Sequence, residues 1–452
     1  MIKAIYHFPR GFLWGTATSS YQVEGYNHGS DWWAWEHENG RILQNQRSGK
    51  ACEWWSGRWR EDFDRAAETG QNAHRLSLEW SRIEPNPALW NDDAIAYYRE
   101  IIQGALERGL DPMVTLHHFS TPQWIQDKGG WRNPEIVHHF RRYTRKVVKQ
   151  LGDLVNLWVT INEPNTYLYF GYLQGDWPPG DHSLRRLPEV ITNLVNAHVA
   201  AYETIHNVAP ESRVGLAHHF RGFRPMNPGN PLDRWAARMK HRAFNDLFPR
   251  VFHTGRVQFS SFRLQLPQAA RKQDFFGLNY YTTELCSFNP LKPGKVFEAG
   301  VYAKDADLSP QGFIANEPAG FWNALRWALR CNTPVYITEN GTEDSGDDFR
   351  RRYLALHLHE LWRAVNYSWP IRGYFHWTLI DNFEWERGWS QKFGLWGMDV
   401  ETQKRSKRKS ADFYAEICSL NGLSSETVAS YAPDVLDLLF PPREPAELTE
   451  DG

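Results

Sequence analysis

The chain has 452 residues, a formal net charge of −2 and a hydrophobic fraction of 41%. This length exceeds that of a single small domain but suits one elaborated α/β barrel, and the apolar fraction is enough for a large core. A charge so close to zero leaves no electrostatic footprint for nucleic acid or for an acidic membrane surface, so we expect neither as a partner.

Four cysteines, Cys52, Cys286, Cys331 and Cys418, are widely spaced and form no CxxC pair. In a chain of this length they indicate reduced structural thiols rather than a disulfide framework. The first residues contain no apolar run of signal-peptide length, and no segment approaches the length of a membrane span. We therefore expect a cytoplasmic protein.

The aromatic content is high, with 22 Trp, 19 Tyr and 25 Phe. Most of these side chains are needed for a large core. Tryptophan beyond that need favours flat apolar platforms that carry an N–H at one edge, on which the C–H face of a sugar ring stacks. Composition alone thus gives a first indication of carbohydrate as the substrate.

Short apolar runs that predict buried strands alternate with amphipathic helical patterns along the chain. In chain order the expected strands are residues 12–14, 74–78, 113–116, 157–161, 214–217, 275–279, 335–338 and 371–377. Between them, Asn91 is placed to cap one helix, and Asn133-Pro134-Glu135 is placed to begin another that ends at Gly152. Strand–helix alternation predicts parallel strands joined by right-handed crossovers.

Eight such strands favour a closed (β/α)₈ TIM barrel, of the α/β class, over an open doubly wound sheet. No GxGxxG or GxxxxGK[ST] motif follows a strand, which excludes the common nucleotide-binding alternatives. We expect one catalytic domain over residues 1–420 with elaborated loops at its C-terminal face. Residues 421–452 lie outside the repeat and are either a docked extension or a partly disordered tail.

The active site of such a barrel lies at the carboxyl ends of its strands. Polar residues end most of the apolar runs, and they predict a ring of carboxylates, amides, an arginine, a histidine and indoles: Gln22, Arg75, His117-His118, Asn162-Glu163, Asn279-Tyr280-Tyr281, Glu339-Asn340, Trp377 and Asp381–Trp385. Glu163 and Glu339 follow the fourth and seventh strands, on opposite sides of the barrel. A pair of facing carboxyl groups suits glycoside hydrolysis, with a separation of about 5–5.5 Å for retention and about 6.5–9.5 Å for inversion.

At these positions the chain resembles the β-glycosidases of glycoside hydrolase family 1, over about residues 8–420. Each motif is weak alone, but together, in this order and at the expected strand ends, they are specific. The motifs are Phe8 to Gly25, Asn72 to Ser77, Thr160 to Pro164, Gly277 to Tyr281, Ile337 to Gly341 and Trp377 to Trp385.

The resemblance implies the role of each catalytic residue. Glu163 would be the general acid/base and Glu339 the nucleophile that forms a covalent glycosyl-enzyme. Arg75 and Tyr281 would keep Glu339 ionised and oriented, and Asn162 would hold the sugar 2-hydroxyl.

The resemblance also implies the residues that bind the sugar. Trp377 would be the floor beneath the ring, and Glu384 would accept hydrogen bonds from the 4- and 6-hydroxyls while repelling a 6-phosphate. Unphosphorylated glucosides are therefore favoured, and galactosides and fucosides stay open. The full expected set is Gln22, His118, Asn162, Asn279, Trp377, Glu384, Trp385 and Phe393.

Two positions depart from the family pattern. Phe119 stands where a tryptophan is usual, and Phe313 is aligned with the usual tryptophan platform for the leaving group. Both concern substrate preference rather than the reaction.

The resulting interpretation is a retaining β-glycosidase acting on small β-glycosides or oligosaccharides without a cofactor. The doublets His117-His118, His138-His139 and His218-His219 invite a metal hypothesis, but no HExxH motif is present and we expect no bound metal. A transglycosidase on the same barrel is the nearest alternative, and a non-catalytic sugar-binding barrel is a further one.

Overall fold

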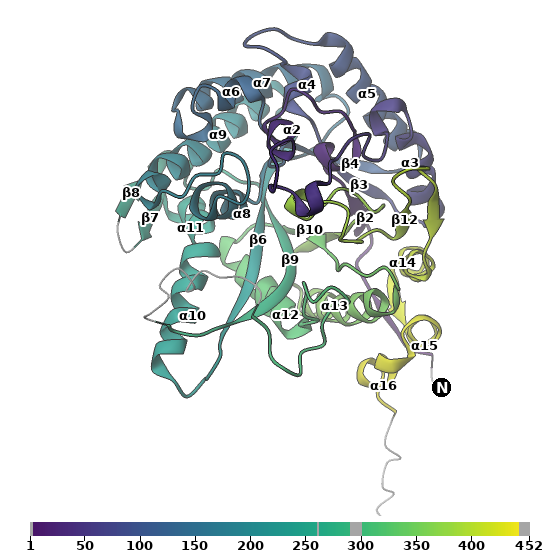
Figure 1. Cartoon of the computed structure of the whole chain (residues 1–452). Coiled ribbons are helices and arrows are strands. Elements are labelled where there is room, and N and C mark those ends of the chain that lie inside the picture. Colours follow the sequence, from purple (N-terminus) through teal and green to yellow (C-terminus); the bar gives the residue numbers. More distant parts are fainter. Residues whose placement is uncertain (1–2, 260–261, 290–300, 443–452) are drawn as a thin grey trace, which may run out of the picture.

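Eight parallel strands form a closed barrel in the computed structural model, which describes residues 3–259, 262–289 and 301–442 (Figure 1). Around the barrel the strand order is β10-β11-β2-β3-β4-β5-β6-β9. The predicted (β/α)₈ TIM barrel is confirmed, and all eight expected strands are present: β2 (Leu13–Ala17), β3 (Ala73–Ser77), β4 (Asp111–His117), β5 (Leu157–Asn162), β6 (Arg213–Pro225), β9 (Phe275–Cys286), β10 (Val335–Asn340) and β11 (Ile371–Trp377).

Helices surround the barrel and begin where their capping residues predict. The Asn91 side chain accepts a hydrogen bond of 3.0 Å from the Ala94 amide at the start of one helix, and Pro134 precedes another. The outer helices are α3 (Trp59–Glu68), α5 (Asp92–Glu107), α7 (Glu135–Leu151), α9 (Leu187–Val208), α10 (Pro231–Phe244), α11 (Leu247–Thr254), α12 (Pro318–Ala328), α13 (Asp348–Asn366) and α14 (Lys409–Leu420).

Shorter elements lie in the connections between strands and helices. Two antiparallel strand pairs, β7 with β8 and β12 with β13, form small sheets separate from the barrel. These elements are α1 (Ser20–Val23), α2 (Asp31–Glu36), α4 (Trp80–Ile83), α6 (Gln123–Gln126), α8 (Pro164–Leu168), β7 (Arg256–Phe259), β8 (Phe262–Gln265), β12 (Trp396–Met398) and β13 (Arg405–Lys407).

The chain after residue 420 packs against the barrel as far as the structure describes it. Strand β14 (Gly422–Ser424) pairs antiparallel with β1 (Ile5–His7), and α15 (Ser425–Tyr431) and α16 (Leu436–Leu439) follow. Leu423, Val428 and Leu439 are buried in the cluster that contains the side chains of α13 and α14. Residues 422–442 are therefore docked, and the remainder of the predicted extension, 443–452, lies outside the described residues.

Strands β6 and β9 are much longer than the apolar runs that predict them. They have 13 and 12 residues and stay paired beyond the barrel, from Gly222 opposite Thr283 to Pro225 opposite Cys286. Polar residues interrupt the apolar pattern there, so the sequence signal ends early. Figure 1 shows β6 and β9 as long neighbouring strands. Their extension carries Arg221 and Glu284, which line the cavity at the barrel mouth.

The fourth strand passes sharply into a helix at the barrel mouth. Glu163 has a left-handed φ of 41° and precedes Pro164, the first residue of α8. A non-glycine residue in that region of backbone conformation carries strain and is common where a side chain is aimed at a functional site. Among the described residues, no helix combines the length and apolar character needed to cross a membrane.

Candidate active site

A cavity with about 1,560 Å³ of empty space, part of it open solvent, lies at the carboxyl ends of the barrel strands. Eight predicted site residues and the two departures from the family pattern line it. They are His118, Phe119, Glu163, Tyr281, Phe313, Glu339, Trp377, Glu384, Trp385 and Phe393, with Phe313 and Phe119 as the departures. The other predicted residues, Gln22, Arg75, Asn162 and Asn279, are buried behind this surface and bond to the residues that line it.

Glu339, on β10, is held by a cation and a hydroxyl. Arg75 Nη1 donates to Glu339 Oε1 at 2.5 Å, and the Tyr281 hydroxyl donates to Oε2 at 2.6 Å. Both side chains of the ion pair are almost fully buried. A carboxylate with a buried guanidinium on one oxygen and a hydroxyl on the other is stabilised in its ionised form.

Glu163, which follows β5, has a different set of neighbours. Asn279 Nδ2 donates to its Oε1 at 2.7 Å, and His219 Nδ1 lies 3.2 Å from its Oε2. The Thr166 hydroxyl lies 3.0 Å from the same ring nitrogen of His219. His219 was not among the predicted site residues, although it faces Asn279 in the register of β6 and β9.

Asn162 connects the two glutamates through its side-chain amide. Its Oδ1 accepts from Arg75 Nη2 at 2.6 Å and from Asn279 Nδ2 at 3.3 Å, while its Nδ2 donates to His118 Nε2 at 3.0 Å. The other ring nitrogen of His118 has no hydrogen-bond partner among the described residues. A continuous network thus runs from the partners of Glu339 to those of Glu163.

The two glutamates influence each other's protonation. Burial raises the pKa of Glu339 to about 7, with Arg75 opposing and the Glu163 charge adding to the rise. Burial also acts to raise the pKa of Glu163, but His219 and Asn279 outweigh it and hold that pKa below its usual value. Because the carboxyl groups interact, their protons leave in two steps that belong to the pair, so the pair retains one proton up to about pH 7.

The far end of the cavity carries Glu384 and two indoles. Gln22 Nε2 donates to Glu384 Oε2 at 3.2 Å, and burial together with the charges of Glu386 and Glu339 raises the pKa of Glu384 to about 8. The His118 ring is roughly parallel to the rings of Trp377 and Trp385. Its centroid lies 5.9 Å from that of Trp377 and 6.0 Å from that of Trp385. Polar and flat apolar surfaces therefore meet at this end.

Another part of the cavity is built from Phe313 and from residues that sequence reasoning did not single out. Phe313 lines the cavity as expected, and the Arg387 guanidinium lies 4.2 Å from the centre of its ring. Trp177 Nε1 donates to Glu386 Oε2 at 2.6 Å. Phe119 packs between Trp177 and Trp385, so its ring is part of an aromatic wall.

Comparison with known proteins identifies the family. The sequence profile of glycosyl hydrolase family 1 matches residues 5–423. The chain belongs to this family. It is a glycoside hydrolase, and the β-glycosidase function predicted from the sequence is confirmed at the level of the family.

Individual members are similar over nearly their whole length. β-Glucosidase A of Thermotoga maritima is 33% identical over 445 residues, covering 92% of this chain and 98% of that protein. The structure of a β-glycosidase from Pyrococcus horikoshii has a TM-score of 0.87 and 37% identity, covering 95% of this chain and 98% of that one. The T. maritima β-glucosidase in complex with glucoimidazole has a TM-score of 0.87 and 32% identity, covering 92% and 100%.

The histidine doublets have local partners in the fold. His117 Nε2 lies 3.1 Å from the Thr121 hydroxyl, and the His218 ring stacks on Phe276 at 4.4 Å. Within the described parts of the chain, no three His, Cys, Asp or Glu side chains are grouped so as to hold a metal ion.

Proposed function

We propose that this family 1 enzyme is a β-glucosidase that releases terminal non-reducing glucose with retention of configuration. The observation that carries the proposal is the asymmetry of the buried glutamate pair. Glu339 bonds to Arg75 and Tyr281, whereas Glu163 bonds to an amide and a histidine. Different partners on two carboxyl groups assign different roles to them.

In the proposed first step, Glu339 attacks the anomeric carbon as the glycosidic bond breaks. Glu163 gives its proton to the departing oxygen, and a covalent glycosyl-enzyme forms on Glu339. This step removes the charge of Glu339, so the now ionised Glu163 takes a proton from water. The water attacks the anomeric carbon, the ester bond to Glu339 breaks, and two inversions give net retention.

The sugar contacts follow from the groups that line the far end of the cavity. We place the sugar ring over Trp377 and Trp385, with the 4- and 6-hydroxyls at Glu384 and the free ring nitrogen of His118 near a further hydroxyl. Asn279 is better described as a positioning residue than as a sugar contact, because it is fully buried and its amide donates to Glu163. The glucoimidazole bound by the T. maritima relative supports a glucose-sized ligand.

The direct test is turnover of p-nitrophenyl β-D-glycosides by the purified protein, with product configuration followed by NMR. We expect release of nitrophenol from the glucoside and β-glucose as the first-formed sugar. Lack of turnover on the gluco-, galacto- and fuco- forms alike would overturn the proposal, and α-glucose as first product would overturn retention.

We expect the carboxyl group of Glu384 to determine how strongly the enzyme prefers sugars that carry a 6-hydroxymethyl group. In Glu384→Ala, kcat/KM for the β-glucoside should fall by about tenfold to a hundredfold, because the hydrogen bonds between this carboxyl group and the 4- and 6-hydroxyls are lost. The β-xyloside lacks the 6-hydroxymethyl group and should lose less, so the glucoside-to-xyloside ratio should shrink by about tenfold. Equal losses for both sugars would contradict this contact, and Glu386→Gln is the control for a neighbouring carboxyl group.

We expect His219 to help set the pH above which kcat/KM falls. The ring holds the pKa of Glu163 down, so its replacement in His219→Phe should raise that pKa and move the loss of activity to higher pH. His219→Asn retains an N–H donor and should lie between the variant and the parent. The measurement is the pH dependence of kcat/KM, and an unshifted limb in His219→Phe would reduce this residue to a packing role.

We also propose a cytoplasmic location for the enzyme. All four cysteines are free thiols in the structure, which supports a reducing compartment.

A further inference from the structure

A separate cavity lies between α10 and α12, against the extended parts of β6 and β9 (Figure 1). It contains about 830 Å³ of empty space, part of it open solvent. Successive residues of a strand face opposite sides, so Gly222 and Thr283 face this cavity while their neighbours Arg221 and Glu284 face the catalytic one. The two paired strands therefore separate this cavity from the catalytic site.

Among the described residues, three guanidinium groups line this cavity against a single carboxylate. Arg224 comes from β6, Arg326 from α12, and Arg330 from the 3₁₀ turn Leu329–Cys331 that follows α12. The carboxylate is that of Glu317, whose Oε1 accepts from Arg224 Nη2 at 2.5 Å. The charged groups of the lining thus leave a surplus of two positive charges, on Arg326 and Arg330.

These two arginines have no acidic partner of their own. Arg326 Nη2 donates to the Asn323 amide oxygen at 3.3 Å, and no ion pair joins Arg326 or Arg330 to an acid in the described parts of the chain. Arg330 attracts Asp246 weakly, but that carboxylate already accepts from Trp327 Nε1 at 2.9 Å. Arg326 and Arg330 lie four residues apart, on one face of the helix, where like charges repel each other. An anion bound between them would remove this repulsion.

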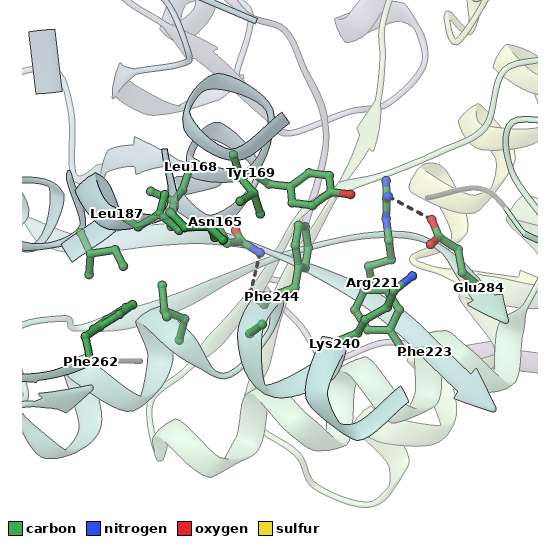
Figure 2. Close-up of a pocket in the computed structure, with 15 residues that line it drawn as sticks. Asn165, Leu168, Tyr169, Leu187, Arg221, Phe223, Lys240, Phe244, Phe262 and Glu284 are labelled. Carbon is green, nitrogen blue, oxygen red and sulfur yellow. Dashed lines mark hydrogen bonds and ion pairs between the residues drawn. The ribbon is translucent and has the colours of Figure 1, made fainter. Parts of the chain in front are cut away.

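Arg221, on the other side of the paired strands, has the more usual arrangement. Its Nη1 lies 3.0 Å from Glu284 Oε1, and Figure 2 shows the two side chains facing each other. A buried guanidinium is matched by an acid in this way because an unmatched charge is costly away from water. Arg326 and Arg330 are exposed instead, so an anion from solvent can reach them.

Aromatic rings form the apolar part of this cavity. The ring centroid of Phe220 lies 5.0 Å from that of Trp327 and 5.7 Å from that of His241, and all three residues line the cavity. A ligand in this place meets flat apolar surface on one side and guanidinium groups on another. This combination favours an organic anion over a bare inorganic ion.

We propose that this cavity binds a small organic molecule that carries a phosphate group. A phosphate monoester has a charge between about −1.5 and −2 at pH 7, which matches the surplus of two positive charges, whereas a carboxylate would match only one. Its oxygens can accept paired hydrogen bonds from the planar groups of Arg326 and Arg330, while its organic part packs against Phe220 and Trp327. The site is independent of the proposed function because it lies outside the catalytic cavity.

Isothermal titration calorimetry of the full-length protein with phenyl phosphate, inorganic phosphate and phenol tests this site. We expect phenyl phosphate to bind once per chain, inorganic phosphate to compete with it at a higher Kd, and phenol, which lacks the charge, not to compete. Absence of binding by both phosphates would overturn the proposal. Equal Kd values for the two phosphates would overturn the assignment of an organic ligand.

Two arginine pairs with the same helical spacing locate the bound phosphate. Arg326→Gln/Arg330→Gln removes the surplus charges and should raise the Kd for phenyl phosphate about tenfold or more. Arg238→Gln/Arg242→Gln removes two exposed arginines of α10 that do not line the cavity, and it should leave the Kd unchanged. Circular dichroism checks that each double variant is folded. Equal losses in the two double variants, or unchanged binding in the first, would overturn the proposal.

A charge-retaining variant separates paired hydrogen bonding from charge alone. Arg326→Lys/Arg330→Lys preserves both positive charges but cannot donate paired hydrogen bonds from one planar group. Its Kd for phenyl phosphate should lie between those of the parent and of Arg326→Gln/Arg330→Gln. A Kd equal to that of the parent would contradict the paired hydrogen bonds that the proposal assigns to these two arginines.

Discussion

Glu339→Gly is expected to lower kcat/KM on p-nitrophenyl β-glucoside by about 10⁴-fold or more, which is about 5.5 kcal/mol of transition-state stabilisation. The variant removes the carboxylate that Arg75 and Tyr281 hold in place. Without it no covalent intermediate can form at the anomeric carbon, and Arg75 is left as a buried cation without its partner. Steady-state kinetics measure the loss, and circular dichroism checks that the barrel is intact.

Azide or formate should restore part of this lost turnover, because the glycine leaves room for a small anion beside Arg75. Attack from the vacated side inverts the centre once, so azide should give the α-glucosyl azide. A restored product in the β configuration would contradict the assignment of Glu339. Glu343→Gln provides a matched control, since this buried carboxyl group lies four residues later and bonds to Ser309 rather than to the partners of Glu339.

The barrel and most of its site could be predicted because both depend on local sequence. Apolar runs of strand length define the strands, and parallel topology places their ends at one rim. Glu163 and Glu339 each end such a run, so their common location follows without knowledge of any contact.

Other features depend on contacts between distant segments. His219 and Asn279 face each other only through the register of β6 and β9, and both reach Glu163 because these strands are adjacent. The family resemblance placed Asn279 among the residues that bind the sugar, but the sequence could not show that its amide donates to Glu163. Trp177 enters the site from a loop, without any periodic signal.

The paired extension of β6 and β9 was also beyond sequence reasoning. Its residues alternate in no simple apolar pattern, and they are held by strand pairing rather than by a continuous apolar face. As a consequence the Arg221–Glu284 ion pair could be found only in three dimensions.

We expect Glu163→Ala to lower kcat/KM far more for substrates with a poor leaving group than for substrates with a good one. For n-alkyl glucosides, whose departing oxygen needs a proton, kcat/KM should fall by about 10²–10⁴-fold. For 2,4-dinitrophenyl β-glucoside the leaving group is a stable anion, so the first step should change by less than about tenfold. The second step still needs a base, so glycosyl-enzyme should accumulate and give a burst of dinitrophenol in rapid mixing experiments.

The pH dependence provides an independent check on the same residue. The glutamate pair keeps its last proton up to about pH 7, so the parent should lose activity on alkyl glucosides as the pH rises through that region. In Glu163→Ala the proton donor is absent, and the high-pH limb for the dinitrophenyl substrate should disappear. Glu343→Gln is a suitable control because it removes a different buried carboxyl group and retains Glu163. Equal losses on good and poor leaving groups would mean that Glu163 orients the substrate rather than transfers a proton, because only proton transfer depends on the basicity of the departing oxygen.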